Sequence, residues 1–243
     1  MQVAQSSPAM PVAADSVISI IVPALNEAGT IEATLRQLQD SRNRGHEVIV
    51  VDGGSSDATV QLARPLTDRV LHAPAGRASQ LQAGADMAHG DLFWFLHADT
   101  RIPAHALDAI VNALSSGSHQ WGYFEVHFPE RTGLLGLVAW MMNRRSRLTR
   151  IATGDQGIFV TRELFSRIAG YRPIPLMEDI TLSRCLKRHS KPACIDMKLT
   201  TSSRRWRRHG ILRTILLMWS LRLAYFLGVS PATLAKYYKP HTS

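Results

Sequence analysis

The stretch Leu92-Phe93-Trp94-Phe95-Leu96-His97-Ala98-Asp99-Thr100 decides the fold class of this chain. A continuous apolar run that ends in polar residues is typical of a strand buried on both faces of a parallel sheet. In open α/β sheets, ligands bind beyond the carboxyl ends of such strands. We therefore expect the Asp99 carboxylate to lie at a binding site.

The sequence on either side alternates between short apolar segments and helical patterns. Strands are predicted over residues 17–22, 47–51, 70–72, 91–96, 121–128 and 158–160. Helices are predicted over about residues 30–39, 77–88, 104–114, 134–142 and 162–168. Two more helices are predicted to begin near residue 57 and after residues 177–179. Such alternation is typical of βαβ units. We predict an α/β fold with a mostly parallel central sheet flanked by helices.

Three segments are expected along the chain. Residues 1–14 are small and polar and predict a flexible tail, residues 15–206 predict one catalytic domain, and residues 207–243 predict a helical C-terminal extension. The N-terminus has no basic segment followed by an apolar core, which does not suit a signal peptide. We therefore expect a cytoplasmic protein.

The net charge limits the classes of partner, and the cysteine content limits the kinds of disulfide and metal site. The 243 residues carry a formal net charge of +9, which favours an anionic partner such as a sugar nucleotide, a phospholipid surface or nucleic acid. The two cysteines are too few for a disulfide framework and lack the paired spacing of a zinc site.

Two loops follow the first two strands. Pro23-Ala24-Leu25-Asn26-Glu27 can place backbone and a carboxylate against a base or ribose, or it can be a plain loop that caps a helix. In Asp52-Gly53-Gly54-Ser55-Ser56-Asp57, the glycines allow close approach to a ligand, which we expect Asp52 to contact. Asp57 is expected to cap the next helix.

Three further residues carry the chemistry expected around Asp99. Arg77 begins a predicted helix and can pair with phosphate or remain a solvated surface side chain. Asp99 suits Mg²⁺ or Mn²⁺, which proteins hold through one or two carboxylates together with substrate phosphates. His97 can bond to ribose, bind metal or pack in the core.

An acidic pair, Glu178-Asp179, begins a later predicted helix. Helix capping and compensation of the helix dipole explain acidic residues at this position. The alternative is a general base, because a carboxylate that faces an acceptor hydroxyl can take its proton.

These motifs, in this order, resemble those of the family 2 inverting glycosyltransferases of GT-A fold over about residues 17–206. The resemblance implies Asp99 as the metal ligand of the DxD motif and Asp179 as the catalytic base of the ED motif. It implies a set of donor-binding residues, namely Pro23, Asn26, Glu27, Asp52, Arg77, His97 and Arg205. It also implies a set of acceptor-binding residues, namely Gly154, Asp155, Gln156, Glu178 and Trp206.

The chain departs from the family pattern at two motifs. His97 stands where the first acidic residue of DxD is expected, and Ser202 stands where the glutamine of QxxRW is expected. Arg205 and Trp206 match the second motif, but processive polymer synthesis is not supported. The chain also resembles a small subgroup of stand-alone transferases named for association with radical-SAM and selenium-related genes.

The resemblance implies a single displacement in which Asp179 deprotonates an acceptor hydroxyl as it attacks the sugar of a nucleoside-diphosphate sugar, with a UDP-sugar favoured. The acceptor is not assigned, and no nucleic acid partner is expected. Two alternatives are a metal-dependent nucleotidyltransferase and a basic membrane-binding or nucleic-acid-binding module without catalysis. A nucleotidyltransferase is expected to have a Gly-rich basic loop after the first strand, and Pro23 to Glu27 is not such a loop. A polyanion-binding surface would avoid acidic residues at one sheet edge.

The apolar segment 211–229 has three interpretations, and Arg213 and Arg222 interrupt it. A spanning helix would bury an arginine at about 2.5–3.5 kcal/mol on insertion scales. Packing against the domain or a second subunit is the second interpretation. We favour the third, an interfacial helix paired with residues 134–142, because arginines 204, 205, 207 and 208 precede it and attract anionic lipid. The expected surface is the inner face of the plasma membrane.

Overall fold

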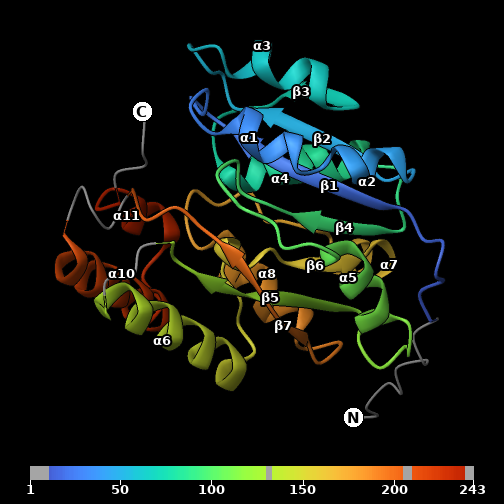
Figure 1. Cartoon of the computed structure of the whole chain (residues 1–243). Coiled ribbons are helices and arrows are strands. Elements are labelled where there is room, and N and C mark those ends of the chain that lie inside the picture. Colours follow the sequence, from blue (N-terminus) through green and yellow to red (C-terminus); the bar gives the residue numbers. More distant parts are fainter. Residues whose placement is uncertain (1–10, 130–132, 205–209, 239–243) are drawn as a thin grey trace.

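The computed structural model describes residues 11–129, 133–204 and 210–238. Seven strands form one sheet, which Figure 1 shows running through the middle of the molecule. The strands are β1 (Ile18–Ala24), β2 (Glu47–Asp52), β3 (Arg69–His72), β4 (Leu92–Phe95), β5 (Trp121–His127), β6 (Phe159–Thr161) and β7 (Ala193–Thr200).

The order of strands in the sheet is β3-β2-β1-β4-β6-β5-β7. The first four run parallel to one another, β6 runs antiparallel to both of its neighbours, and β5 pairs with β7 in parallel. The predicted α/β fold with a mostly parallel sheet is therefore confirmed. The carboxyl ends of β1, β2 and β4 meet at one edge, where the loop motifs follow them.

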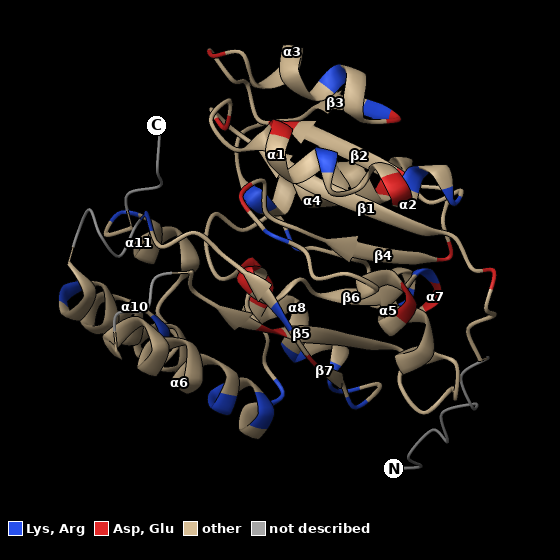
Figure 2. Ribbon diagram, in the orientation of Figure 1, with Lys and Arg blue, Asp and Glu red and all other residues tan. Residues whose placement is uncertain are grey.

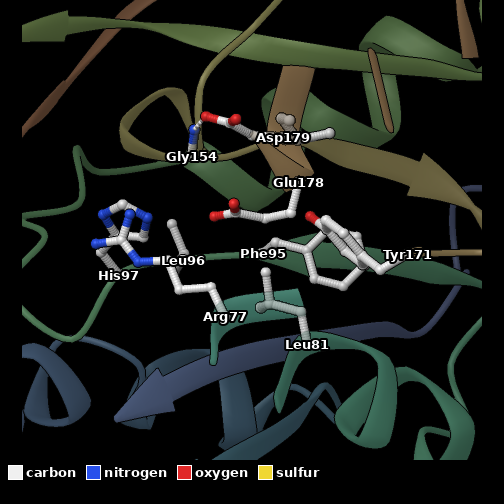
Figure 3. A pocket seen from close by; sticks show the side chains of 10 residues that line it. Arg77, Leu81, Phe95, Leu96, His97, Gly154, Tyr171, Glu178 and Asp179 are labelled. Atoms are coloured by element: carbon white, nitrogen blue, oxygen red, sulfur yellow. Dashed lines mark hydrogen bonds between the residues drawn. The ribbon is translucent and has the colours of Figure 1, made fainter. Parts of the chain in front are cut away.

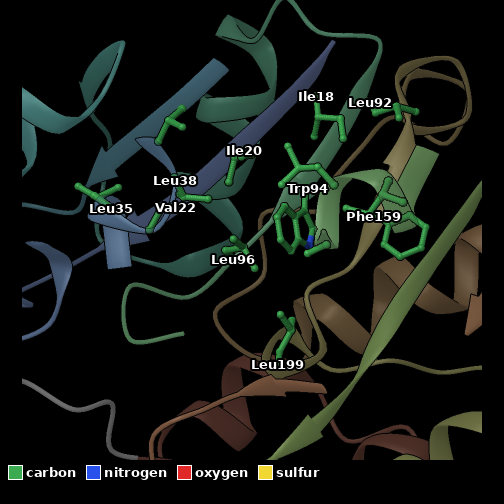
Figure 4. Packing of buried hydrophobic residues seen from close by; sticks show 14 of the residues in the cluster. Ile18, Ile20, Val22, Leu35, Leu38, Leu92, Trp94, Leu96, Phe159 and Leu199 are labelled. Carbon is green, nitrogen blue, oxygen red and sulfur yellow. The ribbon is translucent and has the colours of Figure 1, made fainter. Parts of the chain in front are cut away.

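Helices cover both faces of the sheet because strand residues alternate between two buried clusters. One cluster packs β-strand residues such as Ile20 and Trp94 against α1 (Ile31–Arg36) and α5 (Ala106–Leu114). The other packs residues such as Ile21 and Phe95 against α4 (Arg77–Met87), α7 (Arg162–Arg167) and α8 (Glu178–Leu186). Figure 4 shows the first cluster, in which Trp94 is fully buried. This double cover explains the continuous apolar run of β4.

One local prediction was wrong, because the helix expected over residues 30–39 is divided into α1 and α2 (Gln39–Asn43). The helix expected to begin near residue 57 is present as the short α3 (Thr59–Ala63). No strand was predicted for residues 193–200, which form β7. Its burial is mixed because β7 lies at the edge of the sheet, so it lacks the apolar run of a central strand.

Three helices form a layer beside the sheet, namely α6 (Gly133–Thr149), α10 (Ile211–Phe226) and α11 (Pro231–Ala235). Ile211 and Ile215 of α10 pack on a cluster that includes Leu135 and Val138 of α6. Leu221 of α10 packs in a second cluster with residues on both sides of the α8 N-terminus. Figure 1 shows α6 and α10 side by side. The predicted pairing of the two segments is confirmed.

None of the helices within the described residues has the length and apolarity needed to cross a membrane. Both α6 and α10 nevertheless carry exposed large apolar side chains, among them Trp140, 61% exposed, and Trp219, 54% exposed.

Candidate active site

A cavity of about 1180 Å³ opens at the carboxyl edge of the sheet. Its walls combine the loops after β1 and β4, the start of α4, the loop before β6, the start of α8, and the helices α6 and α10. Nine residues predicted for the site line it, namely Pro23, Glu27, Arg77, His97, Asp99, Gly154, Asp155, Glu178 and Asp179. Segments separated by more than a hundred residues thus contribute to one cavity.

Asp179 is fixed at the start of α8 by backbone donors. Its Oδ2 accepts a hydrogen bond of 2.9 Å from the Gly154 N–H, and its Oδ1 accepts one of 2.7 Å from the Ile180 N–H. The preceding Met177 has a φ of 67°, a left-handed conformation that costs energy for a residue with a side chain. Strain and hydrogen bonds at this turn together fix the position of the carboxylate.

Glu178 is nearly fully buried beside Asp179. Burial, reinforced by the charge of Asp179 and opposed by Arg77, raises the pKa of Glu178 from 4.5 to about 7. Figure 3 shows the Glu178 side chain between Asp179 and the apolar floor formed by Leu96 and Phe95. Glu178 therefore keeps its proton up to a pH near neutrality.

His97 packs across the loop before β6. Its Nδ1 lies 3.2 Å from Asp155 Oδ1. A Cβ added to Gly154 would lie 2.5 Å from His97 Nε2, so the ring occupies the space that a side chain at residue 154 would fill. The absence of a side chain at Gly154 thus lets His97 approach the loop that holds Asp179.

Asp99 and Glu27 lie close enough together to share one cation. Arg204 Nη2 is 2.9 Å from Glu27 Oε2 and 3.3 Å from Asp99 Oδ2. The described residues contain no group of three or more acidic, histidine or cysteine side chains that could hold a metal by themselves. Two carboxylates at this spacing fit Mg²⁺ or Mn²⁺, which complete their coordination with substrate phosphates and water.

Two predicted donor-binding residues organise the loops instead of lining the cavity. The carboxylate of Asp52 is buried and accepts hydrogen bonds from the Gly54 and Ser55 N–H groups, the first at 2.9 Å. Asn26, with a φ of 54°, accepts a hydrogen bond of 2.9 Å from the Ser56 N–H through Oδ1. These contacts join the loops after β1 and β2.

Gln156, which was predicted to bind the acceptor, does not line the cavity. Its side chain is fully buried, its Oε1 accepts a hydrogen bond of 2.7 Å from Ser146 Oγ, and it closes a capping box with Thr153. Gln156 therefore holds the loop from behind the cavity wall. The predicted residues Arg205 and Trp206 lie outside the described residues.

Four arginines in the cavity wall were absent from the predicted site, namely Arg144 and Arg145 on α6, Arg204, and Arg222 on α10. The sequence shows that α6 has a basic end, which includes Arg145, and that Arg222 interrupts the apolar segment 211–229. Only the packing of α6 beside α10 brings those two side chains to the same cavity as Asp179.

The fold and this site define a glycosyltransferase of GT-A fold. The family model for glycosyl transferase family 2 matches residues 19–161, and the chain therefore belongs to that family.

The chain is also similar to individual glycosyltransferases. It is 27% identical to glycosyltransferase AglD of Haloferax volcanii over 177 residues, which are 68% of this chain and 27% of AglD. It thus spans about a quarter of that relative. Among solved structures, the mannosyltransferase PcManGT of Pyrobaculum calidifontis in complex with GDP-Man and Mn²⁺ has a TM-score of 0.62 at 22% identity, covering 98% of this chain and 68% of the other. Residues 1–349 of S. aureus TarS in complex with UDP-GlcNAc have a TM-score of 0.61 at 17% identity, covering 76% and 58%.

Proposed function

We propose that this glycosyltransferase moves a sugar from a nucleoside-diphosphate sugar to an acceptor hydroxyl with inversion, and that Asp179 is the general base. One observation carries the proposal: Asp179 lines the large cavity, with its carboxylate held by the Gly154 and Ile180 N–H groups. A fixed carboxylate can accept the acceptor proton as the bond to the sugar forms, with inversion at the sugar carbon. The diphosphate is a leaving group that needs no proton, so one base suffices.

The donor half of the site is proposed at the loops after β1 and β4. Neighbouring structures are complexes with GDP-Man and UDP-GlcNAc, which supports a nucleotide-sugar donor, and we favour a UDP-sugar. Pro23, Glu27 and His97 line this part of the cavity. Arg77 supplies a positive charge for the phosphates.

We propose that Asp99 holds Mg²⁺ or Mn²⁺, with Glu27 as the nearest second carboxylate. The PcManGT complex contains Mn²⁺, which supports a divalent cation. When bound, the cation would neutralise the charge that develops on the departing diphosphate. Residues of this chain perform the remaining steps: Asp179 receives the proton, and the arginines bind anionic groups.

The division of the chain remains part of the proposal. We propose a catalytic domain over residues 15–206 and an extension over residues 207–243 that lies at an anionic membrane surface, to which the arginines that precede α10 in the sequence are attracted. Membership of the stand-alone subgroup associated with radical-SAM genes is proposed on the motif pattern alone. Membership of family 2 does not favour the nucleotidyltransferase or the non-catalytic alternatives.

The test separates donor binding from proton transfer. A thermal-shift screen of UDP, GDP and their sugars with Mn²⁺ identifies the donor. Asp179→Asn should then retain the nucleotide-dependent shift but release nucleoside diphosphate from the donor about 10²- to 10⁴-fold more slowly. Asp86→Asn, a matched change of an exposed carboxylate on α4, should behave as the wild type. Loss of both binding and turnover in Asp179→Asn would make Asp179 structural and refute the assigned role.

A further inference from the structure

Two arginines from different helices line the cavity, and neither has an acidic partner among the described residues. Arg145 comes from α6 and Arg222 from α10, and both line the cavity. The Nε atom of each is buried and makes no hydrogen bond, although Arg145 Nη2 donates one of 3.0 Å to Ser146 Oγ. Within the described residues, no carboxylate lies within 4 Å of either guanidinium, and in Figure 2 their helices carry basic segments.

The electrostatics of this arginine pair are unfavourable in the empty protein. Burial and the neighbouring Arg222 charge lower the pKa of Arg145 to about 10, and burial lowers the pKa of Arg222. A buried positive charge without a hydrogen-bonded counter-ion is costly, and two together repel each other. Folding alone gives no reason for the pair, whereas a bound anion would supply the missing acceptors. Two guanidinium groups match the oxygens of a phosphate especially well.

The pair lies near the proposed base. Asp179 and Asp155 both raise the pKa of Arg145 and of Arg222, so the two guanidinium groups feel those carboxylates across the cavity. An anion held by the arginines would therefore be near Asp179. Since the donor diphosphate is assigned to the loops after β1 and β4, this anion belongs to the acceptor.

Apolar side chains continue the cavity away from the arginines. Trp140, Met141 and Leu148 line it from α6, and Met218 and Trp219 line it from α10. Exposed apolar surface of this extent marks a binding site for an apolar group. A small water-soluble acceptor would leave these side chains in contact with water, whereas an alkyl chain would cover them.

We propose that the acceptor is a lipid with a phosphate next to its reacting hydroxyl, that Arg145 and Arg222 bind the phosphate, and that α6 and α10 bind the chain. The inference rests on the proposed function in one respect, because it places the reacting hydroxyl at Asp179. The binding step itself does not depend on catalysis.

Three probes distinguish the contribution of the phosphate to binding from that of the alkyl chain. Lysophosphatidylglycerol has phosphate, hydroxyls and one chain; glycerol 3-phosphate has no chain; and a monoacylglycerol has no phosphate. Binding is followed by the fluorescence of Trp140 and Trp219, which line the cavity. We expect lysophosphatidylglycerol to bind most tightly. Equal binding of glycerol 3-phosphate would overturn the assignment of the chain, and equal binding of the monoacylglycerol would overturn the assignment of the phosphate.

Variants separate this site from a structural role. Arg145→Gln and Arg222→Gln should each weaken lysophosphatidylglycerol binding about tenfold to a hundredfold, as expected for hydrogen bonds to a charged group. Without a ligand, both variants should be as stable as the wild type or more stable, because each change relieves repulsion. Arg213→Gln, at an exposed position on α10, is the matched control and should bind normally. Loss of stability in the ligand-free variants with unchanged lipid binding would refute the proposal.

The donor screen keeps the two proposals apart. If UDP or GDP sugars shift the unfolding temperature and lysophosphatidylglycerol does not bind, the proposed function stands and the lipid acceptor is wrong. If the lipid binds through Arg145 and Arg222 but no nucleotide does, the anion site stands and the proposed function is wrong.

Discussion

Glu178 allows the electrostatics of the site to be tested without knowledge of the substrate. Its pKa is raised from 4.5 to about 7 in the folded protein. Between these pH values the unfolded chain releases a proton that the folded protein keeps, so stability falls as pH rises. Below pH 4.5 both states are protonated and the effect vanishes. Above pH 7 both are ionised, and the loss stays constant.

The size of the effect follows from the two pKa values. A shift from 4.5 to about 7 corresponds to a total loss of about 3 kcal/mol at 1.36 kcal/mol per pH unit, of which about 2 kcal/mol falls between pH 5 and pH 8. Glu178 is only 9% exposed, so screening by solvent reduces this free-energy difference little. Glu178→Gln cannot ionise and should therefore lose about 2 kcal/mol less stability than the wild type between pH 5 and pH 8.

Urea unfolding of both proteins at pH 5 and at pH 8 measures this difference. Histidines also titrate in that range, but they are common to both proteins and cancel in the comparison. Glu32→Gln, at a partly exposed position on α1 where Glu32 pairs with Arg36, is the control and should follow the wild type. If Glu178→Gln shows the same change of stability with pH as the wild type, burial does not raise the pKa of Glu178, and the account of the acidic pair is wrong.

Three further predictions concern neighbouring residues. Gly154→Ala forces the added Cβ against His97 and should lower the free energy of unfolding by about 1–3 kcal/mol in urea titrations; an unchanged value would show that the ring moves freely. Asp99→Asn should abolish any Mn²⁺-dependent thermal shift given by a nucleotide while leaving the fold intact, and a retained shift would place the cation elsewhere. Arg204→Gln removes a positive charge that competes with a metal ion for Asp99 and Glu27. Mn²⁺ should then bind about two- to fivefold more tightly in a titration, a small change because a half-exposed ion pair is weak. Weaker Mn²⁺ binding would contradict this competition.

The sequence predicts the fold because the central strands carry strong local signals. The run Leu92 to Leu96 is apolar at every position, since helices cover both faces of β4. β7 escaped prediction because an edge strand buries only some of its side chains, and the pairing of β7 with β5 joins segments about 70 residues apart. The break between α1 and α2 is equally invisible, because the helical pattern continues through Gln37 and Leu38.

Some residues of the candidate site could be predicted from the sequence, and others could not. Asp99, Glu178 and Asp179 follow strands or begin helices, so their positions at one edge follow from topology alone. Gln156 lies in the correct loop but faces the interior, and the direction of a loop side chain depends on tertiary packing. Arg145 and Arg222 belong to no motif. They share the cavity only because Ile211 and Ile215 of α10 pack on α6, a contact between distant segments.

The contact of Arg204 with Glu27 and Asp99 bears on the order in which substrates bind. In the empty protein this guanidinium stands beside the carboxylates that a metal-bearing donor needs, so the donor must displace it. Arg204 and Arg222 line the same cavity, so displacement of the Arg204 side chain by the donor changes the space that the acceptor enters. We expect a compulsory order in steady-state kinetics, with the donor loading first and the acceptor entering a cavity that the donor has already rearranged.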